Sequence, residues 1–284
     1  MSPAAPRACV ALDSDGTVLD TMAPKQHRFL QPMFIEAFGL QPQAAAYRAC
    51  ADFVNLFSAT RGISRFNAIL LTLEAFNAHP DVRAAGFPPV PTADLRAFVE
   101  SGLPLSADAL AGWLRDHPSP FLETLLAWSH AVNDAILASG AVFDVFPGVP
   151  SALAALHARC RVGIVSQSPE RVLRQDWGAH GLLAHVDLVA GQELGAKPAQ
   201  LAALAEGRPP ADVLMVGDAF GDLNAARAFG CRFFPILPGR EGESWERLTR
   251  EVFPDFLAGR YAPEREAELV DAFSAALPER PAWA

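Results

Sequence analysis

Two pairs of aspartates carry the most distinctive chemistry in the sequence. Asp13 and Asp15 follow one run of apolar residues, and Asp218 and Asp222 follow another. If both runs are buried parallel strands, their carboxyl ends meet at one edge of a sheet, which is where open α/β folds bind ligands. Carboxylates this close raise one another's pKa unless a cation lies among them, and hard oxygen ligands suit Mg²⁺. These residues therefore predict a magnesium site at the edge of a parallel sheet.

Other polar residues complete a pattern that suits phosphate chemistry. Ser166 ends a further apolar run and offers a hydroxyl, while Lys197 supplies a positive charge ahead of a helix. Gly16 lets the backbone turn sharply after the first aspartate pair and leaves amides available to an anion. An aspartate pair, a hydroxyl, an ammonium and a metal-binding pair are the groups that transfer of a dianionic phosphoryl group requires. The sequence thus favours phosphoryl transfer.

Each of these features is weak evidence when taken alone. An Asp-x-Asp-Gly segment is more often a turn than a catalytic pair. Ser166 by itself would be a candidate helix N-cap, and Lys197 by itself a solvated surface lysine. All of them in this order, each at the end of an expected strand, favour a functional site instead.

Short apolar runs and helical patterns alternate in the parts of the chain that carry these residues. The expected strands are Cys9–Leu12, Val162–Val165, Val186–Ala190, Val213–Val216 and Phe233–Leu237. The expected helices are Ser151–Ala158, Glu170–Ala179, Ala199–Ala205 and Leu223–Phe229. Such alternation predicts βαβ units and a parallel sheet. Local signals agree, because Ser168 before Pro169 is typical of a helix start and Gly230 of a helix end.

A long segment after the first strand has a different pattern. From about Lys25 to Ala138 the apolar spacing is helical, and no comparable strand is expected. The fold class is therefore α/β, with a parallel-sheet core interrupted by an all-helical insertion. The expected domains are a core formed by 1–22 and 145–240, a helical domain at 23–144, and a C-terminal helical extension at 241–284 that packs on the core.

The order of the motifs resembles that of the haloacid dehalogenase superfamily. The matching residues are Asp13-x-Asp15-Gly-Thr, Ser166, Lys197 and Gly217-Asp218-x-x-x-Asp222. Phe146-Pro147-Gly148-Val149 also resembles the segment by which the chain re-enters the core in members with a helical C1 cap. The resemblance covers residues 8–22 and about 145–237. It implies a Rossmann-like three-layer core with an inserted cap, similar to the β-phosphoglucomutase and phosphoglycolate phosphatase subfamily.

The resemblance also implies roles for individual residues. Asp13 would be the nucleophile that forms an aspartyl-phosphate, and Asp15 would protonate the leaving group and then deprotonate the attacking water. Mg²⁺ would be bound by Asp13, the Asp15 backbone carbonyl and Asp218, with Asp222 acting through water or behind the ligands. The residues that would contact the phosphoryl group are Gly16, Thr17, Ser166, Gln167 and Lys197.

Two residues depart from the family pattern. Ser14 stands where the family usually has an apolar residue, and Gln167 follows Ser166 where Asn is frequent. The first change bears on local packing and the second on contacts near the phosphate. Neither removes a catalytic group.

The second aspartate discriminates among the reactions of the superfamily. Dehalogenases lack it as an acid/base, and phosphonate-cleaving members normally lack it too, so Asp15 favours phosphate chemistry. We therefore expect a Mg²⁺-dependent phosphatase acting on a small sugar- or polyol-phosphate-like monoester. A β-phosphoglucomutase-like mutase is the main alternative, followed by a haloacid dehalogenase. A non-catalytic binding protein would be expected to lose Asp13, Asp15 or Lys197.

The insertion offers candidates for substrate recognition. Arg61-Gly62-Ile63-Ser64-Arg65 lies between two expected helices and is similar to the Lys-Gly-Val-Ser-Arg specificity loop of β-phosphoglucomutases. Lys25 and His27 follow the first motif closely in sequence and are further candidates for contact with the substrate. Arginines in a turn are often solvated or cap a helix, so both interpretations of Arg61 and Arg65 stay open.

Composition limits the classes of partner. The 284 residues carry a net charge of −9, the opposite of what a polyanion-binding surface shows. No apolar run approaches the ~18 residues of a membrane helix, and the N-terminus does not have the pattern of a signal peptide. The four cysteines are too far apart in sequence for a zinc cluster or redox pair. We expect a reduced, cytoplasmic monomer or homodimer that binds a small phosphorylated molecule, without nucleic acid or membrane partners.

Overall fold

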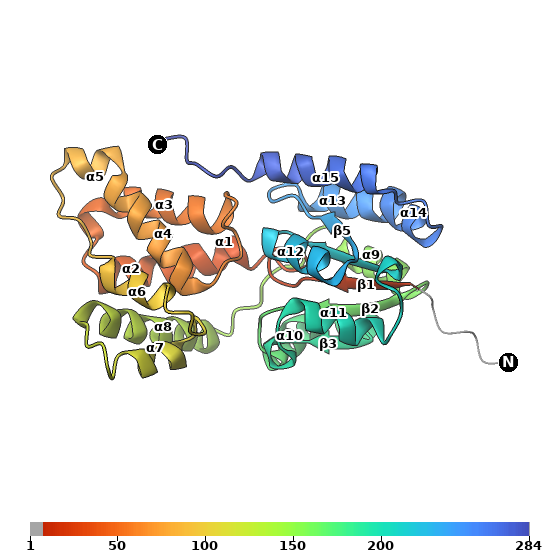
Figure 1. Cartoon of the computed structure of the whole chain (residues 1–284), viewed down its shortest axis with the longest axis horizontal. Coiled ribbons are helices and arrows are strands. Elements are labelled where there is room, and N and C mark those ends of the chain that lie inside the picture. Colours follow the sequence, from red (N-terminus) through yellow and green to blue (C-terminus); the bar gives the residue numbers. More distant parts are fainter. Residues whose placement is uncertain (1–7, 284) are drawn as a thin grey trace. The chain divides into compact units, whose positions relative to one another are not determined.

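The chain divides into two compact units in the computed structural model, which describes residues 8–283 (Figure 1). The first, here called the sheet unit, contains the described residues up to Thr21 together with Val142–Leu277. The second, the helical unit, contains Met22–Ala141 and the residues from 278 to 283. No helix within residues 8–283 has the length and apolar character needed to cross a membrane.

The sheet unit is built on a parallel sheet with the strand order β3-β2-β1-β4-β5. The strands are β1 (Cys9–Leu12), β2 (Arg161–Val165), β3 (Leu188–Ala190), β4 (Val213–Gly217) and β5 (Arg232–Pro235). In the central strand β1, Leu12 is in register with Ile164 of β2 on one side and Val216 of β4 on the other. The loops that follow these three strands therefore leave the sheet at the same edge.

Helices cover both faces of this sheet. They are α9 (Val149–His157), α10 (Glu170–Ala179), α11 (Lys197–Ala205), α12 (Phe220–Phe229), α13 (Glu241–Arg247), α14 (Phe253–Leu257) and α15 (Pro263–Ala276). Shorter helical turns are η3 (Leu182–His185), η4 (Gln192–Leu194), η5 (Pro210–Asp212) and η6 (Leu248–Val252). Val10 and Leu12 pack with α9, α10 and α13, whereas Cys9 and Ala11 pack with α11, α12 and α15. Because successive strand residues point to opposite faces, the unit has three layers, which confirms the expected α/β class.

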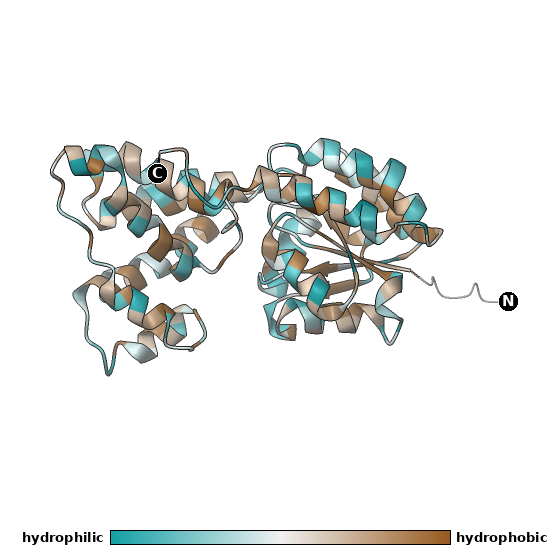
Figure 2. Ribbon diagram, turned by 45° about the horizontal axis from the view of Figure 1, so that its top comes forward, coloured by the Kyte–Doolittle hydropathy of each residue, from teal (hydrophilic) through white to brown (hydrophobic). Residues whose placement is uncertain are grey.

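The core of the sheet unit explains why its strands are recognisable in the sequence. All four residues of β1 are fully buried, and the strands at the centre of the unit are brown in Figure 2, whereas the surrounding helices mix brown and teal. Gly163 in β2 allows α11 to approach closely, because a Cβ at this position would lie 2.6 Å from Leu204 Cδ1. Strands buried on both faces read as continuous apolar runs rather than as alternating patterns.

The helical unit contains no strand among its described residues, as expected for the insertion. Its elements are α1 (Met22–Lys25), η1 (Gln26–Leu30), α2 (Gln31–Ala37), η2 (Gln41–Gln43), α3 (Ala44–Leu56), α4 (Arg65–Ala78), α5 (Pro80–Ala84), α6 (Ala93–Val99), α7 (Ala107–Trp113) and α8 (Pro120–Ala138). Aromatic side chains hold them together. The Phe34 ring stacks on Tyr47 at 5.0 Å and meets Trp128 edge-on at 5.3 Å.

The last described residues differ from the expected C-terminal extension. Helices α13 to α15 belong to the sheet unit, but residues 278–283 belong to the helical unit. The Pro278 carbonyl accepts a hydrogen bond from the Ala59 amide at 3.2 Å. Trp283 packs against Phe53 at 5.8 Å and His79 at 5.3 Å. An aromatic side chain near the end of the chain thus finds its ring partners in the helical unit.

The start of α10 corrects one expectation. The helix begins at Glu170, and Pro169 has an extended ψ of 139° as the residue before it. Ser168 therefore lies outside the helix and does not cap it. Its hydroxyl instead bonds to Asp15. Gly230, by contrast, ends α12 with a φ of +86°, as expected.

Candidate active site

The loop after β1 begins as a continuation of the sheet. The Asp13 amide donates to the Val216 carbonyl of β4 at 3.0 Å, which fixes Asp13 at the sheet edge. The chain then turns back on itself, because the Ser14 carbonyl accepts hydrogen bonds from the amides of Val18 and Leu19, both at 3.0 Å. Gly16 adopts a φ of +81°, a backbone conformation that side chains other than hydrogen disfavour.

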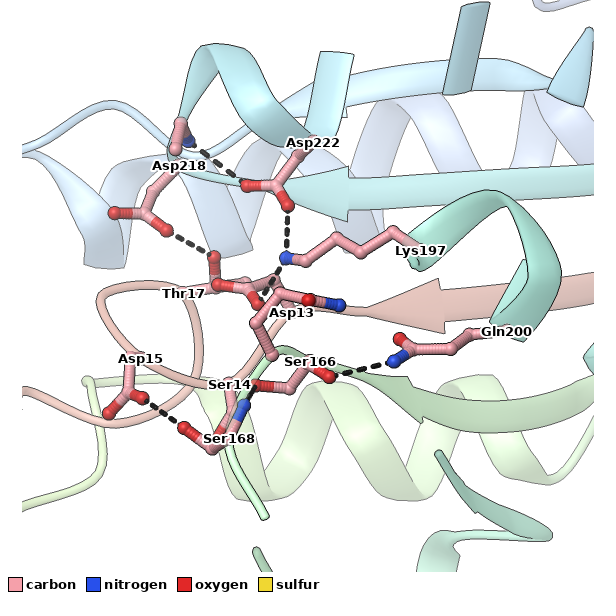
Figure 3. Close-up of polar contacts among 12 residues, drawn as sticks. Asp13, Ser14, Asp15, Thr17, Ser166, Ser168, Lys197, Gln200, Asp218 and Asp222 are labelled. Atoms are coloured by element: carbon pink, nitrogen blue, oxygen red, sulfur yellow. Dashed lines mark hydrogen bonds and ion pairs between the residues drawn. The ribbon is translucent and has the colours of Figure 1, made fainter. Parts of the chain in front are cut away.

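Three carboxylates meet beside this loop. Asp13, Asp218 and Asp222 are buried, and each offers an oxygen within 4.8 Å of the others (Figure 3). Lys197, the first residue of α11, places its Nζ 2.6 Å from Asp13 Oδ1 and 2.5 Å from Asp222 Oδ1. Residues from the ends of β1 and β4 and from the start of α11 therefore converge, although 205 residues separate Asp13 from Asp218 in the sequence.

The electrostatics of this cluster suit a bound cation. Burial raises the pKa of Asp13 well above its ordinary value; the Lys197 ammonium opposes this shift, and the carboxylates of Asp222 and Asp218 add to it. Burial likewise raises the pKa of Asp222 against the attraction of Lys197. Burial alone would lower the pKa of Lys197, but its two carboxylate partners raise it. The three buried carboxylates carry more negative charge than the single ammonium neutralises. Carboxylates are also hard oxygen donors, so this donor set fits Mg²⁺.

The two later aspartates are held by different partners. Asp218 Oδ1 accepts a hydrogen bond from the Thr17 hydroxyl at 2.9 Å. Asp222 accepts from the Ala219 amide through Oδ2 and from Lys197 through Oδ1. Gly217 makes room for this arrangement, since a Cβ there would lie 2.3 Å from Asp222 Cγ. Both oxygens of the Asp222 carboxylate therefore have partners, and Asp218 is held by the loop after β1.

The loop after β2 reaches the other aspartate of the first motif. Asp15 points toward this loop in Figure 3, and its Oδ2 accepts a hydrogen bond from the Ser168 hydroxyl at 2.9 Å. Ser166 is buried and its Oγ accepts from the Ser168 amide at 3.2 Å. Gln167 is exposed, and its Nε2 donates to the Gly195 carbonyl at 3.3 Å. The sheet unit thus contains every residue that the sequence assigned to the phosphate and metal sites, and Asp15 lies outside the carboxylate cluster. The roles of these residues stay predictions.

Comparison with known protein families identifies the chain. The model of the haloacid dehalogenase-like hydrolases matches residues 8–230, which is most of the chain. The chain belongs to this hydrolase family. The match confirms the resemblance seen in the motifs.

Named relatives and solved structures are more distant. A phosphoglycolate phosphatase of Vibrio vulnificus (strain YJ016) is 29% identical over 208 residues, which are 70% of this chain and 90% of that protein. A predicted phosphoglycolate phosphatase from Haemophilus somnus is 17% identical and has a TM-score of 0.48, with 80% of this chain and 84% of that chain covered. An L-2-haloacid dehalogenase from Xanthobacter autotrophicus is 16% identical and has a TM-score of 0.39, with 94% and 87% covered.

Gln200 is a site residue that the sequence analysis missed. It lies one turn after Lys197 in α11 and is fully buried. Its Nε2 lies 2.9 Å from the Ser166 carbonyl, 2.8 Å from that of Gly191 and 3.0 Å from that of Gly195. The side chain therefore ties together the loops that follow β2 and β3 in this hydrolase. A polar residue on the buried face of a helix is the signal that could have revealed it.

Two buried tryptophans also support the first loop. Trp177 in α10 donates its indole N–H to Ser14 Oγ at 2.9 Å, and Trp245 in α13 donates to the Thr17 carbonyl at 2.9 Å. The first contact explains the serine that departs from the family pattern, because a buried indole N–H needs an acceptor. The sequence alone does not reveal either contact, since neither tryptophan is near the loop in sequence.

The arginines proposed for substrate recognition have partners within the helical unit. Arg65 Nη1 donates to the carbonyl and hydroxyl oxygens of Ser129, and its Nη2 donates to Asn133 Oδ1 at 2.8 Å. Arg61 is buried and donates to the Leu56 carbonyl at 2.9 Å. These contacts favour a role in holding the helices together, and contact with a substrate stays a prediction for both residues.

The other two candidates lie at the start of the helical unit. Lys25 is the last residue of α1, and His27 pairs with Asp52 of α3, with Nε2 and Oδ1 2.8 Å apart. Gln31 donates to the same carboxylate oxygen at 2.6 Å. The role of Lys25 and His27 in recognition likewise stays a prediction.

Proposed function

We propose that this hydrolase is a Mg²⁺-dependent phosphatase that cleaves a small sugar- or polyol-phosphate-like monoester through an aspartyl-phosphate on Asp13. One observation carries the proposal. The Asp13 carboxylate is fixed at the sheet edge, bonded to Lys197 and gathered with Asp218 and Asp222, while Asp15 is held two residues away. This arrangement would supply a nucleophile and charge for the phosphoryl oxygens in a buried cluster, with an acid/base on the same loop.

In the first step, an Asp13 carboxylate oxygen attacks phosphorus. The bond from phosphorus to the ester oxygen breaks, and the protonated carboxyl of Asp15 gives its proton to the departing alkoxide. An alcohol leaves, and the phosphoryl group is now bonded to Asp13. Lys197 and the hydroxyl of Ser166 contact the phosphoryl oxygens and hold them while charge redistributes.

In the second step, water attacks the phosphoryl group of Asp13. The Asp15 carboxylate accepts a proton from this water, the bond between phosphorus and the Asp13 oxygen breaks, and inorganic phosphate leaves. Both residues return to their starting forms, because Asp15 is protonated again and Asp13 is a carboxylate. Gln200 keeps the Ser166 loop in place throughout, since its Nε2 donates within the group of carbonyl oxygens of Ser166, Gly191 and Gly195.

Mg²⁺ would be held by Asp13, the Asp15 carbonyl and Asp218. When bound, the ion supplies positive charge that offsets the charge of the phosphoryl oxygens and of the attacking carboxylate. Asp222 has both oxygens engaged, one by Lys197 and one by the Ala219 amide, so it acts by orienting Lys197 beside the ligands.

The test is a phosphate-release screen with the purified chain. The panel contains 2-phosphoglycolate, which the name of the Vibrio vulnificus relative suggests, together with sugar and polyol phosphates. We expect turnover of at least one member with Mg²⁺ and none with EDTA. Equal turnover in EDTA, or no turnover of any phosphomonoester, would contradict the proposal. Isomerised sugar phosphate in excess of free phosphate would indicate a mutase instead.

A further inference from the structure

The segment after β5 reaches back to the loop that carries the first aspartates. Helix α13 lies beyond residues 8–230, the part of the chain that the family model matches. Its Trp245 is 1% exposed and donates the indole N–H to the Thr17 carbonyl at 2.9 Å. A residue outside the part of the chain that matches the family model thus donates a hydrogen bond directly to the motif that contains Asp13 and Asp15.

Local hydrogen bonds and packing in the core hold the helix that carries Trp245. Ser244 accepts a hydrogen bond from the Leu237 amide at 3.0 Å and donates to the Arg240 carbonyl at 3.0 Å. The Trp245 carbonyl accepts a hydrogen bond from the Thr249 hydroxyl at 2.7 Å. The Trp245 ring also belongs to the hydrophobic core that includes β1 and α9. The indole is therefore presented to Thr17 from a fixed position.

Thr17 passes this contact on to the carboxylate cluster. Its hydroxyl donates to Asp218 Oδ1 at 2.9 Å, and Thr17 and Asp218 are 0% and 2% exposed. Two buried hydrogen bonds, joined through the atoms of Thr17, therefore connect α13 to a carboxylate of the proposed Mg²⁺ site. Because these hydrogen bonds are buried, water cannot readily replace a lost donor.

We propose that Trp245 is a positioning residue for the metal site. Its N–H fixes the Thr17 carbonyl, and this holds the Thr17 hydroxyl in the orientation that aims Asp218 Oδ1. This inference rests on the proposed function, since it assigns Asp218 to the Mg²⁺ site. Partners behind metal ligands orient those ligands, and their loss typically weakens metal binding by about 10- to 100-fold.

Two substitutions separate the donor from the packing. Trp245→Phe keeps an aromatic ring but removes the N–H. Trp245→His removes the benzo ring but keeps a five-membered ring whose Nε2–H occupies the corresponding place. Each variant is titrated with MgCl₂ by calorimetry after metal removal, and its melting temperature is recorded without metal. The kcat and KM values for the best substrate of the screen are measured at saturating Mg²⁺.

Trp128→Phe is the matched control. Trp128 is a buried tryptophan of the helical unit whose Nε1 has no hydrogen-bond partner within the described residues. We expect this variant to bind Mg²⁺ as the wild type does. We expect Trp245→Phe to bind Mg²⁺ about 10- to 100-fold more weakly, whereas Trp245→His should melt at a lower temperature yet keep an affinity close to that of the wild type.

Two results for the Mg²⁺ affinities of these variants would overturn the inference. If Trp245→Phe keeps its Mg²⁺ affinity, or if Trp245→His loses affinity as well as stability, Trp245 acts only by packing. Should Trp245→Phe fail to fold, the affinity of Trp245→His alone decides. Failure of the proposed function looks different, because the wild type itself would then bind no Mg²⁺ or show activity that Mg²⁺ does not affect.

Discussion

Ser14 and Trp177 form a buried pair at the residue scale, and the pair predicts a stability effect. Ser14→Ala leaves the indole N–H of Trp177 in the core without the acceptor it has at 2.9 Å. An unsatisfied buried donor costs about 1–3 kcal/mol, so we expect the free energy of unfolding to fall by this amount in urea titrations. The double variant with Trp177→Phe removes donor and acceptor together. It should lose less stability than the sum of the two single variants, and strict additivity would show that the pair does not interact.

Ser168 allows a second prediction at this scale, because its hydroxyl holds the proposed acid/base Asp15. The hydroxyl stabilises the carboxylate that forms as Asp15 gives up its proton, and loss of a hydrogen bond to a charged group costs about 1.5–3 kcal/mol. Ser168→Ala should therefore lower kcat/KM for an alkyl phosphate by roughly 10-fold or more. The same value for 2,4-dinitrophenyl phosphate should stay unchanged, because dinitrophenolate leaves without protonation.

Ser168→Thr keeps the hydroxyl and serves as the matched control for this measurement. It should behave as the wild type with both substrates. Equal losses on both substrates in Ser168→Ala would mean that Ser168 supports the loop as a whole rather than the proton transfer.

At the scale of elements, the sequence predicts where strands and helices lie better than where they end. The central strands β1 and β4 are recognisable because burial on both faces demands a short apolar run. The last strand was expected to reach Leu237 but ends at Pro235, and the Leu237 amide bonds to Ser244 instead of a neighbouring strand. Similarly, β3 starts at Leu188 because Val186 closes the helical turn η3. Contacts with other elements determine where these strands begin and end, and the local sequence pattern does not show those contacts.

The junction of β4 and α12 gives a prediction at this scale. In Gly217→Ala the new Cβ would overlap Asp222, which lies 2.3 Å away. Overpacking of this kind costs about 1–3 kcal/mol, and the shift of Asp222 would also disturb Lys197. We expect reduced stability and loss of most phosphatase activity.

Gly221→Ala is the control for this junction, because nothing lies within 4 Å of its Cβ position in α12. Alanine is favoured over glycine in a helix by about 1 kcal/mol, so this variant should be as stable as the wild type or more stable. If both glycine variants behave alike in thermal melts and activity assays, the close approach of Asp222 does not constrain position 217.

At the scale of the whole molecule, the candidate site was predictable where its residues follow strands directly. The motif residues Asp13, Ser166 and Asp218 fall at the ends of apolar runs, and parallel strands bring such ends together. The contacts of Trp177 and Trp245 are not predictable from the sequence. The two tryptophans lie 163 and 228 residues, respectively, from the loop residues they contact, and an indole side chain is not a typical sign of a phosphate or metal site. Side chains that support a site from behind are visible only once the fold is known.

The four cysteines give a prediction for the folded chain as a whole. All are buried and free of disulfides, and burial raises the pKa of Cys50, Cys160 and Cys231 to about 12. The thiols therefore stay protonated at pH 8. At this pH a maleimide reagent should label the native chain very slowly, whereas in urea it should label all four cysteines. Fast labelling of the native chain would show that these side chains are accessible.

The same shifts fix the sign of a pH effect. Because the folded pKa values lie above the ordinary value of 9.0, the unfolded chain loses these protons first as the pH rises. The protonated thiols therefore contribute to the stability of the folded chain, and this contribution is fully present below about pH 9 and is lost as the pH approaches 12. Urea titrations should thus give a falling free energy of unfolding across this range, and a rising one would contradict the assignment.

The most direct test of the central claim is to trap the covalent intermediate. The chain is mixed with its best substrate and Mg²⁺, quenched in acid within one turnover, and digested for mass spectrometry. We predict a phosphoryl group on the peptide that contains Asp13, and none in the Asp13→Asn variant, whose amide cannot serve as the attacking carboxylate. A phosphoryl group on another residue, or turnover by Asp13→Asn at the wild-type rate, would contradict the account.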